Sequence, residues 1–422
     1  MKNNVSSKQI YFWNLLGNLM FAGSSAIFMM IVSRLSSAKM ADTFSLAYGI
    51  AGILVVIGLF QVRTYQGTDV TFKHEFTSYA IARVISIVVM LLSLFPYLLL
   101  VHFDFSDFSK LAVVLLYVFF RMCEAISDLF QGLFQQHERL DIAGKSMTIR
   151  YGLSVIILYL SLLFVKSLEL SLLILFLFNF IFVCLYDFPK SLAFDKISFN
   201  KRTIKLQLKE ALAILKNCIP LFISGFLLAY IFNEPRIAID KAIELGVLAE
   251  GLQRNYNILF MPVFFMSLFI LILRPLTTSL AQNWQNKEFD KFDGMMKRIG
   301  FYLIGGGVVL TLLSFLIGIP ILSLVFGVDL SGNAWTLSIL VFSGILYSIG
   351  IVLGDTLTIF RLQRKLLWVY LFMFIIAILI TSPLVMKEGL LGASYSFLCV
   401  MIIYSVGSYL TYIYARKRKG NR

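Results

Sequence analysis

Apolar stretches long enough to cross a lipid bilayer recur along almost the whole chain. A helix needs about 20 apolar residues to cross ~30 Å of hydrocarbon. Of the 422 residues, 59% are hydrophobic and 14% are charged, and the mean hydropathy is +0.85, whereas soluble domains are about 25% charged. The sequence therefore predicts an all-α polytopic membrane protein with about twelve transmembrane helices, at residues 9–33, 40–62, 78–101, 108–132, 146–165, 168–187, 213–233, 252–273, 298–319, 335–357, 365–384 and 389–414.

The longest polar break between these spans divides them six and six. Its second part mixes leucine and isoleucine with lysine and arginine, a composition typical of a helix lying in the membrane interface. Two equal halves are typical of pseudo-symmetric transporters whose site lies between the halves. We therefore predict two pseudo-symmetric six-helix bundles: an N-terminal lobe (1–195), a cytoplasmic amphipathic linker helix (196–212) and a C-terminal lobe (213–422).

Lysine and arginine are unevenly distributed among the connections between spans. With the N-terminus inside, 27 of the 37 fall in or beside the inner segments, seven in the outer connections and three in or at the edges of spans. The positive-inside rule then predicts that both termini are cytoplasmic. The net charge of +14 is explained by inner loops that meet anionic lipid headgroups, so we do not expect a nucleic-acid partner.

The fourth predicted span carries three charged residues, Arg121, Glu124 and Asp128. Their spacing places them on one face of a helix. A charge at the bilayer centre costs roughly 2.5–3.5 kcal/mol on insertion scales, so this face must turn away from lipid. Two interpretations can coexist: an ion pair between Arg121 and Glu124 that tightens helix packing, or the lining of a polar path across the membrane.

Other polar residues inside or at the ends of spans are candidate substrate contacts. Asn14 and Asn18 lie one turn apart in the first span, where they could equally support close helix contact. Arg34 closes that span on the outer side, a common place for a snorkelling arginine. The remaining candidates are Arg63 within the polar cluster 61–69 at the inner mouth, Arg236 and Asp240 in a predicted loop after Pro235 (alternatively a solvated ion pair), Arg254, and Arg274.

Several classes of catalytic chemistry find no support in the sequence. There is no Walker-type phosphate loop. The three histidines and four cysteines show no metal-ligand or disulfide spacing. No long outer connection could hold the carboxylate pair of a membrane glycosyltransferase. We therefore expect a protein that is not an enzyme and that uses neither cofactor nor metal.

Several segments together resemble the polysaccharide repeat-unit (Wzx-type) flippases of the multidrug/oligosaccharidyl-lipid/polysaccharide exporter superfamily. The resemblance covers most of the chain, including residues 12–69, and becomes generic beyond about residue 300. The matching segments are Trp13–Asn18, Val32–Arg34, Arg63–Asp69, Phe134–Asp141, Asn233–Asp240, Phe260–Pro262, Arg274–Leu276 and Leu280–Trp284.

The resemblance implies a flippase of the bacterial cytoplasmic membrane that works by alternating access. Its substrate would be an oligosaccharide repeat unit on undecaprenyl pyrophosphate, destined for capsule or other surface polysaccharide. Arginine suits the pyrophosphate, while Glu124 and Asp128 suit sugar hydroxyls or a coupling proton or sodium ion; the membrane potential could also drive the cycle. The implied partners are the lipid-linked glycan, membrane lipids, and the polysaccharide polymerase and chain-length proteins.

Two other functions compete with this interpretation. A drug/cation antiporter of the same fold would favour a more apolar cavity, which Arg121 disfavours. A membrane enzyme such as a repeat-unit polymerase is expected to carry a long, arginine-bearing outer loop, whereas every outer connection predicted here is short.

Overall fold

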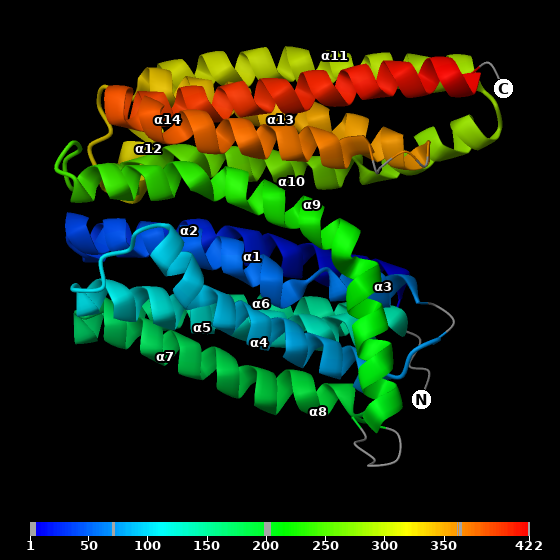
Figure 1. Cartoon of the computed structure of the whole chain (residues 1–422), viewed down its shortest axis with the longest axis horizontal. Helices are drawn as coiled ribbons and strands as arrows, with labels where there is room; N and C mark the ends of the chain where they lie inside the picture. The colour runs from blue at the N-terminus through cyan, green and yellow to red at the C-terminus, as the bar shows by residue number, and fades with distance from the viewer. Residues whose placement is uncertain (1–5, 70–71, 198–203, 361, 363–364, 421–422) are drawn as a thin grey trace. The chain divides into compact units, whose positions relative to one another are not determined.

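The computed structural model is almost entirely helical (Figure 1). It describes residues 6–69, 72–197, 204–360, 362 and 365–420, with the side chains of 264–278 and 417–420 excluded. The chain divides into two compact units, Met1–Ala229 and Tyr230–Arg422. The predicted lobe boundaries at 195 and 213 stay a prediction.

The first unit is a bundle of long helices joined by short turns. Successive long helices alternate in direction (Figure 1), and α2 lies most deeply in the unit, with 67% of its most apolar segment buried. The elements are α1 (Ser7–Leu35), α2 (Ala38–Leu59), α3 (Val62–Thr68), α4 (Phe76–Leu100), α5 (Phe108–Gln136), α6 (Leu140–Val165), α7 (Leu168–Phe182), the π-helical turn η1 (Val183–Asp187), α8 (Phe188–Ser191) and the first part of α9 (Ile204–Glu244).

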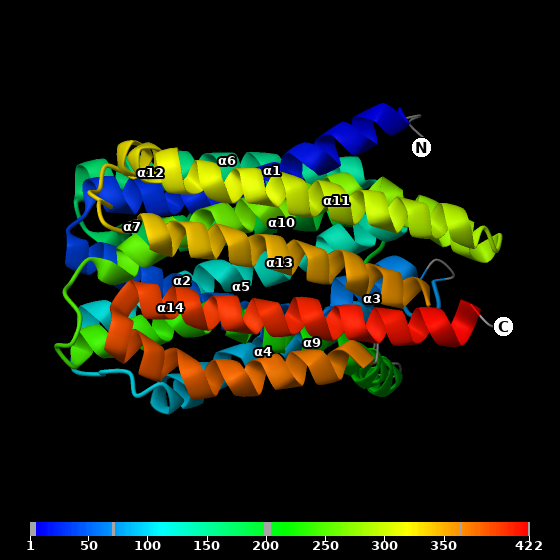
Figure 2. The same ribbon diagram turned by 90° about the horizontal axis from the view of Figure 1, so that it is seen from above.

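The second unit is built around α13, whose most apolar segment is 72% buried. In contrast, the most apolar segment of the α11–η2–α12 rod is not buried at all, as its place along the edge of this unit in Figure 2 suggests. The elements are the end of α9, α10 (Leu252–Gln285), α11 (Phe289–Leu313), the π-helical turn η2 (Ser314–Gly318), α12 (Ile319–Phe326), α13 (Ala334–Ile359) and α14 (Leu366–Gly420).

The predicted twelve spans are confirmed among the described residues. Nine helices are apolar and long enough to cross a membrane. One of them, α14, contains two spans, because Gly389 leaves the helical region (φ 60°, ψ −132°) and reverses the chain into a hairpin. The other two spans are α10 and the charge-bearing α5, and together these give the all-helical, two-part arrangement that the sequence predicts.

Proline determines the local form of two spans. Proline lacks an N–H and cannot complete the helical hydrogen-bond ladder. Pro189 is the second residue of α8, which directly follows η1, and Pro320 is the second residue of α12, which directly follows η2. A π-helical turn absorbs the disturbance without ending the helix. As a result, α12 continues the rod that starts at Phe289.

Pro235 likewise does not end its helix. The sequence predicts a loop over 233–241, but α9 runs through Pro235 to Glu244. Prolines are tolerated in membrane helices because neighbouring groups satisfy the freed backbone atoms. The predicted linker helix also merges into α9: its described part, from Ile204, is continuous with the following span, while 198–203 lie outside the described residues.

Two glycines allow α1 and α6 to touch backbone to backbone. A Cβ atom at Gly144 would lie 2.2 Å from the Trp13 carbonyl oxygen, and one at Gly17 would lie 2.7 Å from the Gly144 carbonyl oxygen. Small residues permit such close helix packing in membranes. This contact brings α6 against the segment of α1 that carries Asn14 and Asn18.

We expect Gly144→Ala to lower the midpoint of thermal unfolding in detergent. The new methyl group meets backbone atoms, which cannot move away as a side chain can, and overpacking of this kind costs about 1–3 kcal/mol. Gly152→Ala on the same helix is the matched control, because its nearest neighbour is the flexible Met20 Cε at 3.4 Å. Equal effects of the two substitutions would contradict the assigned α1–α6 contact.

Candidate functional site

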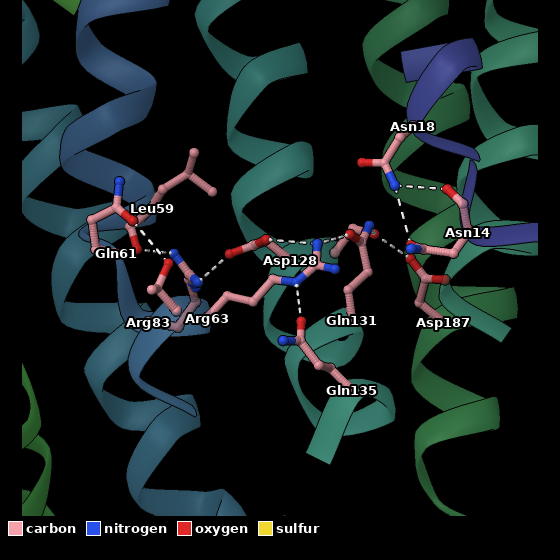
Figure 3. A network of polar contacts seen from close by, with 12 residues as sticks. Asn14, Asn18, Leu59, Gln61, Arg63, Arg83, Asp128, Gln131, Gln135 and Asp187 are labelled. Carbon is pink, nitrogen blue, oxygen red and sulfur yellow. Dashed lines mark hydrogen bonds and ion pairs between the residues drawn. The ribbon is translucent and has the colours of Figure 1, made fainter. Parts of the chain in front are cut away.

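The polar centre of the first unit is an ion pair between Arg83 on α4 and Asp128 on α5 (Figure 3). Arg83 Nη2 lies 2.7 Å from Asp128 Oδ2, and the arginine side chain is only 2% exposed. Its Nη1 donates to the carbonyl oxygens of Gly58 and Leu59, at 2.6 and 2.7 Å. One guanidinium therefore joins α4 to α5 and caps the end of α2.

The end of α2 needs such a cap because the chain changes direction there. Phe60 and Gln61 both adopt left-handed backbone conformations (φ 43° and 55°). The last carbonyls of a helix have no partner within it and carry partial negative charge. The Arg83 guanidinium donates hydrogen bonds to these carbonyl oxygens, and its positive charge balances their partial negative charge. The break sets the short helix α3 at a new angle, and α3 carries Arg63.

Arg63 approaches the same carboxylate from the other side (Figure 3). Its Nη1 is 3.4 Å from Asp128 Oδ1 and donates to Gln131 Oε1 at 2.5 Å, while its Nε donates to Gln135 Oε1 at 3.2 Å. The Arg63 and Asp128 side chains remain 25% and 15% accessible. The structure therefore brings two predicted site residues together, and both side chains stay partly exposed.

The network continues from α5 to a buried carboxylate. Gln131 donates to the Ser127 hydroxyl at 3.1 Å, and Ser127 donates to Asp187 Oδ2 at 2.6 Å. The Ser146 hydroxyl on α6 donates to the other oxygen, Asp187 Oδ1. Asp187 ends the π-helical turn η1. This connection extends the network from α4 and α5 to α6 and η1, and π-helical turns are frequent at functional sites.

Arg121 and Glu124 form a second ion pair on α5, with Nη1 and Oε2 2.6 Å apart. The Tyr151 hydroxyl hydrogen-bonds to Glu124 and accepts a hydrogen bond from Arg150 at 3.1 Å. The side chains of Arg121 and Glu124 are 15% and 11% accessible. The ion pair that the sequence suggests is therefore present, and it lies at the edge of accessible space.

The first-span candidates lie partly buried beside this region. Asn18 Nδ2 donates to the Asn14 carbonyl oxygen at 2.7 Å and to Asn14 Oδ1 at 3.1 Å (Figure 3). Each amide thus keeps part of its hydrogen-bonding capacity. Arg34, in the last turn of α1, is exposed.

The candidates of the second unit have a different environment. Arg236 is fully buried, donates to Asn257 and Asn233 side chains at 3.0 and 2.9 Å, and stacks 4.9 Å from the centre of the Phe260 ring. It joins α9 to α10. Arg254 is half-buried and contacts Asn255 at 3.3 Å, and Asp240 is half-buried on α9. The side chain of Arg274 lies outside the described residues. The role of each in substrate binding stays a prediction.

Three charged residues of the network are missing from the sequence-based candidates: Arg83, Arg150 and Asp187. A lone arginine inside an apolar span marks a functional or structural polar contact, and this signal is present for Arg83. Asp187 follows the apolar run of the sixth predicted span, where it resembles an ordinary terminal residue. Only the packing of α7 against α5 and α6 shows that it is buried.

Comparisons with known proteins show the fold and a distant relative. No family model matches the chain. The chain is 24% identical over 406 residues to the capsular polysaccharide biosynthesis protein CapF of Staphylococcus aureus, covering 94% of this chain and 97% of the relative. Among solved structures, it resembles an inward-facing multidrug resistance MATE family transporter of the MOP superfamily (TM-score 0.69, 13% identity, 96% and 94% coverage). It also resembles the lipid II flippase MurJ in an inward closed conformation (TM-score 0.64, 13% identity, 96% and 86% coverage).

We expect Arg83→Ala to destabilise the protein much more than Arg63→Ala. Breaking a buried ion pair by removing one partner costs about 3–5 kcal/mol, and this change also leaves the carbonyls of Gly58 and Leu59 without their donor. The more accessible Arg63 contributes at most about 1 kcal/mol through its ion pair. Thermal unfolding of the two purified variants in the same detergent measures the difference. Similar losses would show that Arg83 does not anchor the network.

Proposed function

We propose that this chain, which has the fold of the MOP superfamily transporters, is a flippase for lipid-linked oligosaccharides. It moves undecaprenyl-pyrophosphate-linked repeat units from the inner to the outer leaflet by alternating access, for assembly of capsule or another surface polysaccharide. The observation that carries the proposal is the end-to-end similarity to a capsular polysaccharide biosynthesis protein, in a chain whose fold is shared with a lipid II flippase.

The chemistry of the first unit supports this proposal. Arg63 and Arg121 are both partly accessible, and a guanidinium can bind two oxygens of a pyrophosphate at once. Glu124 and Asp128 each hold one of these arginines in place. In the proposed cycle they also accept hydrogen bonds from sugar hydroxyls or bind a coupling proton or sodium ion when an arginine moves to the substrate.

The short connections between helices support a transporter over an enzyme. The described connections on the predicted outer side are 36–37, 101–107, 166–167, 245–251 and 327–333, together with the hairpin at Gly389. None has room for a catalytic domain. We therefore place the protein among transporters, not among repeat-unit polymerases.

The protein is a multi-pass membrane protein, and we propose that it lies in the bacterial cytoplasmic membrane with both termini in the cytoplasm. The lysine and arginine bias of four to one supports this orientation. Membrane lipids and the lipid-linked glycan are its primary partners. The polysaccharide polymerase and the chain-length proteins are proposed partners because they would receive the translocated repeat unit.

Deleting the gene in its bacterial host tests the proposed function. Lipid-linked repeat units should accumulate in the inner leaflet while surface polysaccharide disappears, because synthesis of the unit continues but its export stops. Extraction and mass spectrometry of the lipid-linked units measure the accumulation. Unchanged polymer together with raised susceptibility to cationic drugs would instead support the antiporter, whose fold this chain shares.

The role of Arg121 can be tested in the same deletion strain. We test two variants: Arg121→Ala, and the double exchange Arg121→Glu with Glu124→Arg. Each should restore at least about tenfold less surface polysaccharide to the deletion strain than the wild type does, since a hydrogen bond to a charged group is worth ~1.5–3 kcal/mol. Membrane levels of each variant, measured by immunoblot, control for insertion. Full activity of the exchanged pair would show that Arg121 and Glu124 act only as a packing pair.

A further inference from the structure

A long groove lies on the second unit, apart from the polar network described above. It is bounded by the first turns of α11, the middle of α13 and the last turns of α14, and has a volume of about 700 Å³. Its walls are mostly aliphatic, with Leu303, Val352 and Leu353 among them. Gly300 leaves one side open, because a Cβ atom there would meet nothing within 4 Å. The groove therefore suits a flexible hydrocarbon chain.

The position of α11 determines what surrounds this groove. Past the groove, the rod that starts with α11 continues into its most apolar segment, which has no buried residue and a mean hydropathy of 2.6. In a membrane protein such a surface contacts lipid, since an apolar helix that is not covered by protein is covered by hydrocarbon. Ile304 and Val406, which line the groove, are themselves 57% and 51% exposed. Lipid chains can thus enter from the side.

One end of the groove is polar and carries two cations and one carboxylate. Arg416 near the end of α14 pairs with Asp293 of α11 at 2.9 Å, which neutralises both. Lys297, one turn further along α11, is exposed and forms no ion pair or hydrogen bond among the described residues. The polar end therefore presents, beside the apolar channel, an exposed lysine that pairs with no carboxylate among the described residues.

We propose that this groove binds an anionic phospholipid of the surrounding membrane. One acyl chain lies along Leu303, Val352 and Leu353, and the phosphate is bound by Lys297. The basis is charge complementarity at the end of an apolar channel that opens on lipid. The predicted orientation adds support, because it places the start of α11 at the cytoplasmic surface, where anionic headgroups attract lysine. The inference does not depend on the proposed flippase function.

The alternative occupant is the polyprenyl chain of a lipid-linked substrate. An undecaprenyl chain is more than twice as long as a phospholipid acyl chain, and it carries a pyrophosphate that would require more than one cation. The groove has one free cation among its described residues, because Arg416 is held by Asp293. These features favour the phospholipid.

Native mass spectrometry of the purified full-length protein tests the proposal. Dioleoyl phosphatidylglycerol and dioleoyl phosphatidylcholine serve as probes, with undecaprenyl phosphate as competitor. The wild type should retain phosphatidylglycerol in preference to phosphatidylcholine. Lys297→Gln should weaken phosphatidylglycerol binding roughly fivefold, the effect of one basic residue near an anionic headgroup. Arg298→Gln, which changes an exposed neighbour outside the groove, should leave binding unchanged.

Substitutions that fill the groove provide an independent test of the proposal. Gly300→Leu should abolish retention of the bound lipid, because the new side chain occupies the channel. Gly305→Leu is the matched control: it lies on the same helix and is equally open, but does not line the groove. Gly300→Ala serves if the leucine variant is unstable, with a smaller loss expected. Equal effects at Gly300 and Gly305, equal binding of the two phospholipids, or displacement by undecaprenyl phosphate at equal concentration would overturn the proposal.

Discussion

The buried ion pair between Arg83 and Asp128 is the interaction on which the first unit depends. Charges removed from water cost several kcal/mol each unless every donor and acceptor finds a partner. Arg83 meets this condition through the carboxylate of Asp128 and the carbonyls of Gly58 and Leu59. It therefore requires α2, α4 and α5 to be in place together. A displaced helix would leave a charge or a carbonyl unsatisfied in a membrane.

The same pair creates the accessible part of the site. Since Arg83 occupies one oxygen of Asp128, the other oxygen is left for Arg63, which arrives on the short helix α3. The left-handed residues Phe60 and Gln61 make this approach possible by breaking α2 from α3. The accessible arginine is thus positioned by a buried one. A structural charge and a candidate binding charge share one carboxylate, so movement of Arg63 toward a solute would not leave Asp128 without a partner.

Local sequence signals predict ion pairs within one helix, but they do not predict ion pairs between helices. The spacing of Arg121 and Glu124 is sufficient to predict their ion pair, because both lie on one helix three positions apart. The partners of Asp128 are not predictable in this way, since Arg83 and Arg63 are 45 and 65 residues away. Arg236 shows that a local signal can also mislead. Its position beside Pro235 predicts a loop residue, yet α9 continues through Pro235, and the buried Arg236 side chain donates to Asn257 on α10.

The sequence by itself determined the class of the protein, the twelve spans and the presence of a charged face on the fifth helix, α5. These features depend on local hydropathy and on helical periodicity, which neighbouring residues set without reference to the rest of the chain. Tertiary structure alone decided which charges are neutralised, where α2 ends, how α1 and α6 touch, and where a groove remains open. Those outcomes depend on which helices become neighbours, because a buried polar group in a membrane is stable only beside a partner supplied by another helix.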